Sequence, residues 1–146
     1  MDQVELHKAT KRYSRANTWR SLFQTSTALL IFFASLSLLI VLLHLQASIW
    51  VILLLSLLSS PIVLQLFIII HDCCHTSYFT SRRACFLLGH FLGVLTFTAY
   101  CDWQRTHGIH HRFMANLEQR GVGDIWLMTL EEYRTADKWT KFRYWL

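Results

Sequence analysis

The chain has 146 residues, a hydrophobic content of 53% and a net charge of +5, with a positive mean hydropathy of +0.32. A single soluble core is disfavoured, because no Lys, Arg, Asp or Glu occurs between Ser21 and His71. An uncharged run of this length is enough for two membrane spans of ~20 residues each. The positive charge lies outside this run and accompanies no nucleic-acid-binding motif, so nucleic acid is disfavoured as a partner.

The first 20 residues are polar and basic, with Asp2 and Glu5 against Lys8, Lys11, Arg12, Arg15 and Arg20. We expect a cytoplasmic tail whose charge fixes the orientation of the spans; a solvated tail without a further role is the alternative. The first apolar run starts too late and is too long for a signal peptide, and it lacks a small-residue cleavage pattern. We therefore expect it to remain as a membrane anchor.

Two spans are predicted, at about residues 22–45 and 49–70. The first would be roughly 36 Å long as a helix, enough to cross a ~30 Å hydrocarbon core with some tilt. Pro61 removes one backbone hydrogen bond inside the second, which membrane helices tolerate when a neighbouring group satisfies the freed carbonyl. Basic residues also follow the second span, so the positive-inside rule predicts that both ends of the hairpin are cytoplasmic. These residues are Arg82, Arg83, Arg105, Arg112 and Arg120.

Two histidine clusters follow the uncharged run, at residues 71–75 and 107–111. The clusters contain His71 and His75, and His107, His110 and His111. On a helix, the histidines of each cluster share one face. Neutral imidazole suits Fe, Zn, Cu and Ni, and five histidines exceed the three ligands usual for a single catalytic zinc. Two metal ions would use them better. A carboxylate at the bilayer centre is costly, so Asp72 places the first cluster at the cytoplasmic end of the second span.

Two other interpretations of the histidines stay open. They could be surface residues or a proton relay. They could also belong to a metalloprotease motif, in which two histidines four apart flank a glutamate base. His71 and His75 have that spacing, but Asp72 stands where the glutamate belongs, and the second cluster has no role in that scheme.

The segment of residues 86–99 is apolar but covers only about two-thirds of the length needed to cross, which indicates an interfacial, re-entrant or packed segment. Gly89 and Gly93 would allow it to pack closely, and we interpret His90 as a packing residue rather than a ligand. After residue 112, charged and aromatic residues interleave, which predicts an amphipathic helix on the membrane surface or a solvated linker. We interpret the four cysteines as reduced and as small apolar residues: Cys73, Cys74, Cys85 and Cys101.

At these clusters the chain resembles the membrane fatty acid desaturases. His71-Asp72-Cys73-x-His75, followed by Ser77-Tyr78-Phe79-x-Ser81, resembles the first histidine box of the family and its tail. The later stretch Trp103-x-x-x-His107-x-x-His110-His111 resembles the second histidine box of the family. Two further stretches are similar to the bacterial acyl-lipid type of the family, often called delta-12 or omega-6. They are Gly89–Tyr100 and Asn116-Leu117 through Arg120-Gly121-x-Gly123-Asp124-x-Trp126. The resemblance runs from about Ser60 to the end of the sequence.

The resemblance implies an all-α membrane protein. Its fold would be a hairpin of two transmembrane helices followed by cytosolic or interfacial helices, as in part of a four-helix desaturase fold. Residues 1–20 would form the tail and residues 21–146 a partial desaturase domain. The protein would lie in a bacterial inner membrane or the endoplasmic reticulum, with both histidine boxes cytoplasmic.

The resemblance also implies an oxidoreductase that introduces a cis double bond into a fatty acyl chain of a lipid. Members of the family use two non-haem irons, O2, and electrons from ferredoxin or cytochrome b5. All five clustered histidines would be iron ligands by this resemblance: His71, His75, His107, His110 and His111. Asp72 would orient a ligating imidazole through its second nitrogen, and Asp124 and Trp126 are further candidates for residues that support the ligands.

The sequence departs from the family pattern at three points. Cys74 and Thr76 stand where the family usually has Gly, and Ala99 stands where it usually has Pro. The family also has two more spans and a third histidine box downstream, so we expect an incomplete, inactive fragment that by itself binds iron poorly. The alternatives are a related di-iron hydroxylase or ketolase, and a non-catalytic, degenerate membrane hairpin.

Overall fold

The computed structural model describes residues 2–11, 16–114, 116–117 and 126–146. In these ranges the regular elements are all α-helices, which confirms the predicted all-α class. They are α1 (Gln3–Lys11), α2 (Thr18–His44), α3 (Ile49–Cys74), α4 (Arg82–Leu95), α5 (Tyr100–Phe113), α6 (Leu130–Thr135) and α7 (Lys138–Trp145). The chain divides into two compact units, Met1–Cys101 and Asp102–Leu146, and each is described by itself.

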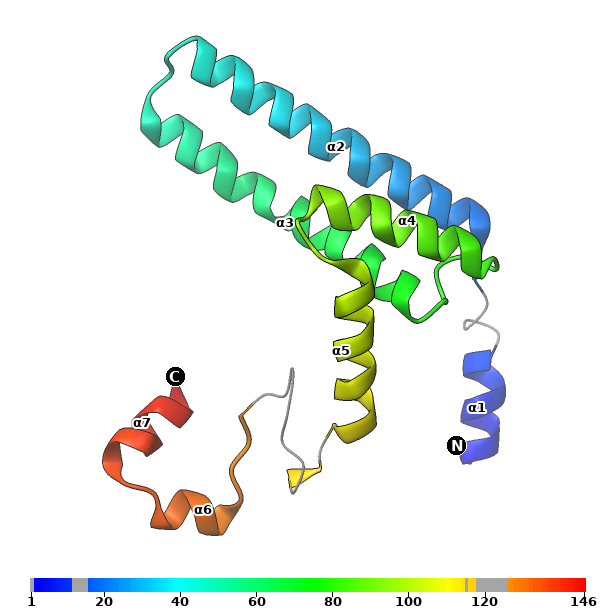
Figure 1. Ribbon diagram of the computed structural model, residues 1–146, viewed down its shortest axis with the longest axis vertical. Coiled ribbons are helices and arrows are strands. Elements are labelled where there is room, and N and C mark those ends of the chain that lie inside the picture. The colour runs from blue at the N-terminus through cyan, green and yellow to red at the C-terminus, as the bar shows by residue number, and fades with distance from the viewer. Residues whose placement is uncertain (1, 12–15, 115, 118–125) are drawn as a thin grey trace. The chain divides into compact units, whose positions relative to one another are not determined.

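The first unit is built on a helical hairpin. Both α2 and α3 are long and apolar enough to cross a membrane, as the two predicted spans require. They pack against each other in antiparallel directions, and α4 packs on α3 (Figure 1). The fully buried side chains gather where α3 meets α4, at Leu66, Ile69, Ile70 and Leu92. The remaining apolar surface of the hairpin is exposed, as expected for a face in contact with lipid.

Two helix boundaries differ from the predictions. The tail predicted for residues 1–20 contains α1, and α2 already begins at Thr18, where the Oδ1 atom of Asn17 accepts a hydrogen bond from the Arg20 amide at 3.1 Å. Residues 3–11 include no Gly or Pro, so a charged composition does not prevent a helix there. In addition, α3 continues four residues past the predicted end of the span, so His71 lies in the helix and His75 is its C-cap residue.

Three helices end in left-handed residues other than glycine. Gln46, Thr76 and Phe97 have φ values of 53°, 53° and 54°. After α3, the Thr76 amide donates to the Cys73 carbonyl at 3.0 Å and the Ser77 amide to the Asp72 carbonyl at 3.1 Å. This pattern is a Schellman motif, which satisfies the last carbonyls of the helix and favours glycine at the left-handed position. Thr76 therefore occupies a position where the backbone disfavours a β-branched residue.

The loop after α3 is tied to the start of α2 through Tyr78. Its hydroxyl donates to the Ser21 carbonyl at 2.9 Å and lies 3.0 Å from the Thr25 hydroxyl. The Ser21 hydroxyl in turn donates to the Tyr78 carbonyl. All three side chains are buried, and burial raises the pKa of Tyr78 although the hydrogen bond from Thr25 acts against this. This network fixes the loop that leaves the first histidine cluster.

The start of α5 is anchored on α4 by Tyr100. A β-carbon at Gly89 would lie only 2.2 Å from the Tyr100 ring, and one at Gly93 only 2.6 Å from the Thr98 carbonyl. The predicted close packing at these two glycines is thereby confirmed. Tyr100 is 3% exposed. It holds the turn between α4 and α5 against the face of α4.

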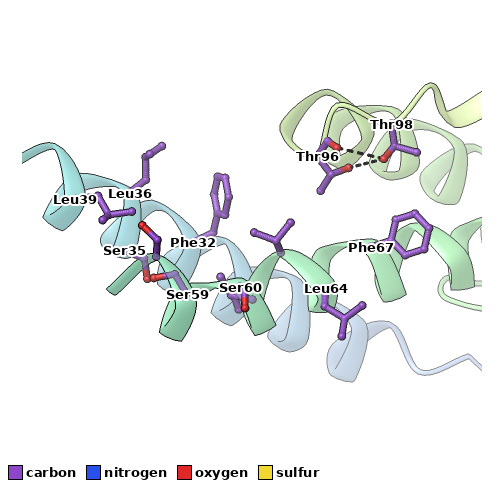
Figure 2. A pocket seen from close by; sticks show the side chains of 13 residues that line it. Phe32, Ser35, Leu36, Leu39, Ser59, Ser60, Leu64, Phe67, Thr96 and Thr98 are labelled. Carbon is purple, nitrogen blue, oxygen red and sulfur yellow. Dashed lines mark hydrogen bonds between the residues drawn. The ribbon is translucent and has the colours of Figure 1, made fainter. Parts of the chain in front are cut away.

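Pro61 lies inside α3, where its missing amide leaves the Leu57 carbonyl without the usual helical donor. The hydroxyl of Ser60 donates to this carbonyl at 2.8 Å. Ser60 also lines an apolar groove of about 580 Å³ formed by α2, α3 and the turn after α4 (Figure 2). The side chain thus satisfies a backbone group that lipid could not.

We expect Ser60→Ala to lower the free energy of unfolding by about 1 kcal/mol, because the Leu57 carbonyl loses its donor. In a Pro61→Ala background the restored amide serves that carbonyl, so the same substitution should cost little. A double-mutant cycle measured by unfolding in detergent micelles would give the coupling energy.

Ser56→Ala is the matched control for this cycle. The Ser56 hydroxyl bonds to the Ile52 carbonyl at 2.8 Å, where the regular helix already supplies an amide donor. Its removal should be nearly neutral and independent of Pro61. Equal costs for the Ser60 substitution in both backgrounds would contradict the assigned role.

We expect Thr76→Gly to raise the free energy of unfolding by about 1 kcal/mol, because glycine adopts the left-handed conformation without a steric cost. Cys74→Gly serves as the control, since this position is the last residue of α3 and has helical backbone. A glycine there should destabilise by about 1 kcal/mol. Thermal unfolding of both variants in the same detergent checks the opposite signs; shifts of the same sign would argue against the assignment.

Candidate metal site

The last turn of α3 brings His71 and His75 together. His71 lies in α3 and His75, four positions later, is the C-cap residue of the helix. Their Nε2 atoms lie 3.3 Å apart. The ring centroids are 4.6 Å from each other. His71 is half-buried and His75 exposed. This pair presents two ring nitrogens at one point beside the end of the helix.

Asp72 lies beside the other nitrogen of His71. Its Oδ1 atom is 3.3 Å from His71 Nδ1. A carboxylate accepts from an N–H group, so this contact places the proton on Nδ1 and leaves the lone pair on Nε2. This is the geometry that the predicted orienting role of Asp72 requires.

The second unit holds a similar pair on α5. His107 and His111 are also four apart, with Nε2 atoms separated by 3.0 Å. His110 stands beside this pair, with its ring centroid 6.0 Å from that of His107 and 5.7 Å from that of His111. The structure thus brings His107 and His111 into close contact, and His110 forms the outer member of the cluster.

Trp103 supports this second pair. Its ring stacks on His107 with an interplanar angle of 13° and a centroid distance of 4.5 Å. Trp103 is the first residue of the second histidine motif, and the motif alone assigns it no role. The spacing of four residues to His107 was the available signal, because such residues are neighbours on a helix. Stacking restricts the rotation of the imidazole.

Both pairs have a separation that suits a metal ion. Two nitrogens bound ~2.1 Å from one ion lie about 3.0–3.4 Å apart when their bonds meet at about 90–110°. The spacings in the pairs, 3.3 Å and 3.0 Å, fall in this range. Neutral imidazole is also a suitable donor for iron. The histidines could therefore hold metal, and the donor set fits the group implied by the resemblance.

The two other candidate supporting residues come from the segment after α5. Asp124 lies outside the described residues. Trp126 lies against α7, with its ring centroid 5.6 Å from that of Tyr144 and the Arg143 guanidinium 5.7 Å above it. Trp126 thus packs with Tyr144, whose ring also lies 5.9 Å from that of Tyr133.

Comparison with known proteins agrees with this kind of site. The model of the fatty acid desaturase family matches residues 47–146. A fatty acid desaturase of Bacillus subtilis (strain 168) is 38% identical over 142 residues, which cover 97% of this chain and 40% of the relative. The omega-3 fatty acid desaturase fat-1 of Caenorhabditis elegans is 26% identical over 77 residues, or 53% of this chain and 19% of the relative. No solved structure matches the chain.

The fold is that of a helical membrane protein with two candidate spans, and each unit carries a pair of histidines that could hold a metal ion. The extent of the family match then identifies the family: this chain belongs to the fatty acid desaturases. It spans 40% of the length of the Bacillus subtilis relative.

We expect Trp103→Leu to weaken metal binding by about two- to tenfold, which corresponds to the loss of an aromatic contact of about 0.5–1.5 kcal/mol. Titration of the purified chain with Co2+, followed by its visible absorption, measures the affinity. Trp103→Phe keeps a stacked ring and is the matched control. A Leu variant that binds as tightly as the Phe variant would show that stacking does not position His107.

Proposed function

We propose that the protein containing this chain is a di-iron fatty acyl desaturase that introduces a cis double bond into an acyl chain. The observation that carries the proposal is two similar pairs of imidazoles, each four residues apart, one at the C-terminal end of α3 and one on α5. Family membership supports the reaction class. The substrate would be a fatty acyl lipid.

In this proposal the metal ligands are His71, His75, His107, His110 and His111. When bound, the iron pair supplies the O2 chemistry that removes hydrogen from an unactivated methylene. Asp72 keeps the proton of His71 on Nδ1, so that Nε2 is available as a ligand. Asp124 and Trp126 remain candidates for supporting residues. Ferredoxin or cytochrome b5 would deliver the electrons.

The proposal includes a membrane orientation. Basic residues flank the hairpin on both sides and its turn has none, so both ends and both histidine boxes would face the cytoplasm. Residues 1–20 would form the cytoplasmic segment that precedes a desaturase domain beginning at residue 21. The membrane would be the bacterial inner membrane or the endoplasmic reticulum.

The test is fatty-acid profiling of cells that express the longest reading frame containing this chain. We expect new monounsaturated or polyunsaturated acyl chains by gas chromatography and mass spectrometry. His107→Ala should abolish the product, because an iron ligand is lost. His44→Ala, at a histidine at the end of α2 that belongs to neither box, is the matched control and should retain it.

The product also separates the alternatives. A hydroxyl or keto group on the acyl chain would show that the protein is a related hydroxylase or ketolase and not a desaturase. If the wild type and both variants insert normally into the membrane and none of them forms a modified acyl chain, the result would favour a non-catalytic hairpin. Unchanged product in His107→Ala would remove this histidine from the iron site.

A further inference from the structure

A second cluster of reactive side chains lies in the first unit, apart from the histidine boxes. The Sγ atom of Cys101 is 3.3 Å from Nε2 of His90. The other nitrogen of this ring, Nδ1, lies 2.8 Å from the Phe86 carbonyl. A carbonyl can only accept, so Nδ1 carries the proton and Nε2 of the neutral ring accepts from the Cys101 thiol. A nucleophile, a base and a group that orients the base are thus aligned.

The surroundings hold the His90 ring in this position. Its centroid lies 4.1 Å from that of Phe86 and 4.8 Å from that of Tyr100. Tyr100 is itself fixed on α4 through its contact with Gly89. The imidazole therefore packs against two aromatic rings, whose centroids lie 6.1 Å apart, and the base does not depend on a flexible loop.

Cys101 differs from the other thiols of the first unit. Cys73 and Cys85 are buried and Cys74 is half-buried, whereas Cys101 is exposed and free. It is the second residue of α5. The neighbouring Asp102 is paired with Arg105 at 2.8 Å, which offsets its negative charge. This thiol is accessible to a reagent in solution.

An apolar groove of about 440 Å³ begins at His90. Its lining includes Val94, Phe97 and Ala99, and it has little polar surface. Phe97 is 99% exposed and Val94 75% exposed. Exposed apolar side chains next to a nucleophile favour an electrophile that carries a hydrocarbon chain.

We propose that Cys101 is an acylation site that accepts a long-chain fatty acyl group from an acyl thioester such as acyl-coenzyme A. His90 Nε2 takes the thiol proton as Cys101 Sγ attacks the thioester carbonyl. The bond from the carbonyl carbon to the coenzyme sulfur breaks, and His90 returns the proton to this leaving thiolate. The products are a Cys101 thioester and the free coenzyme thiol, so atoms and electrons balance without an oxidant or a metal.

This inference is independent of the desaturase proposal. The dyad contains none of the iron ligands proposed above, and the acyl transfer requires neither iron nor O2. A protein without desaturase activity could still be acylated at Cys101. A desaturase could equally lack the modification, so the two proposals can fail separately.

The experiment incubates the full chain in detergent micelles with an alkyne-tagged palmitoyl-coenzyme A and locates the label by peptide mass spectrometry. We expect a hydroxylamine-sensitive label on Cys101, none there in Cys101→Ser, and normal labelling in Cys74→Ser. His90→Gln should lower the labelling rate by about tenfold or more, because a general base is lost. His90→Asn, whose amide can still donate to the Phe86 carbonyl, should show the same loss and guards against a folding defect.

A chain-length comparison tests the groove separately. Val94→Ser should slow labelling by the palmitoyl thioester but not by acetyl-coenzyme A or iodoacetamide. Label spread evenly over the four cysteines would overturn the proposal. Labelling at Cys101 that is unchanged in both His90 variants would also overturn it.

Discussion

Every backbone polar group inside a bilayer needs a partner from the protein itself, and the hairpin depends on this constraint. In α3 the break comes at Pro61, and Ser60 supplies the missing donor to the Leu57 carbonyl. Because the helix continues past the proline to Cys74, His71 is part of the same helix as the span and His75 is its C-cap residue. A loop at this point would leave His71 and His75 without a fixed spacing.

Helical periodicity then determines the chemistry of both boxes. A spacing of four residues brings two imidazoles to the same face of a helix. The Nε2–Nε2 separations of 3.3 Å and 3.0 Å match those of adjacent ligands of one ion. Spacing alone leaves the rings free to rotate about their side-chain bonds. Asp72 fixes one ring through a hydrogen bond, whereas Trp103 fixes another by stacking. The two pairs are therefore preorganised by different means.

The sequence was sufficient for the features that depend on local periodicity. Hydropathy predicted both spans, and the spacing of the histidines predicted that His71 and His75 share a face. The sequence was insufficient for the features that depend on the backbone conformation of the turns. Gln46, Thr76 and Phe97 adopt left-handed conformations without being glycine, and no residue preference signals this. His90 was interpreted as a packing residue; its ring does pack on Tyr100, but its contact with Cys101 depends on the turn between α4 and α5.

This turn shows why residues close in sequence can escape prediction. Gly93 and Gly89 remove the side chains that would keep the returning backbone away from α4. The Thr98 amide then donates to the Gly93 carbonyl at 2.7 Å, and Tyr100 enters the space over Gly89. Cys101 follows directly and meets His90, the residue after Gly89, which is rotated by about 100° around the helix axis. The dyad is thus a consequence of the same glycines that were predicted only to allow close packing.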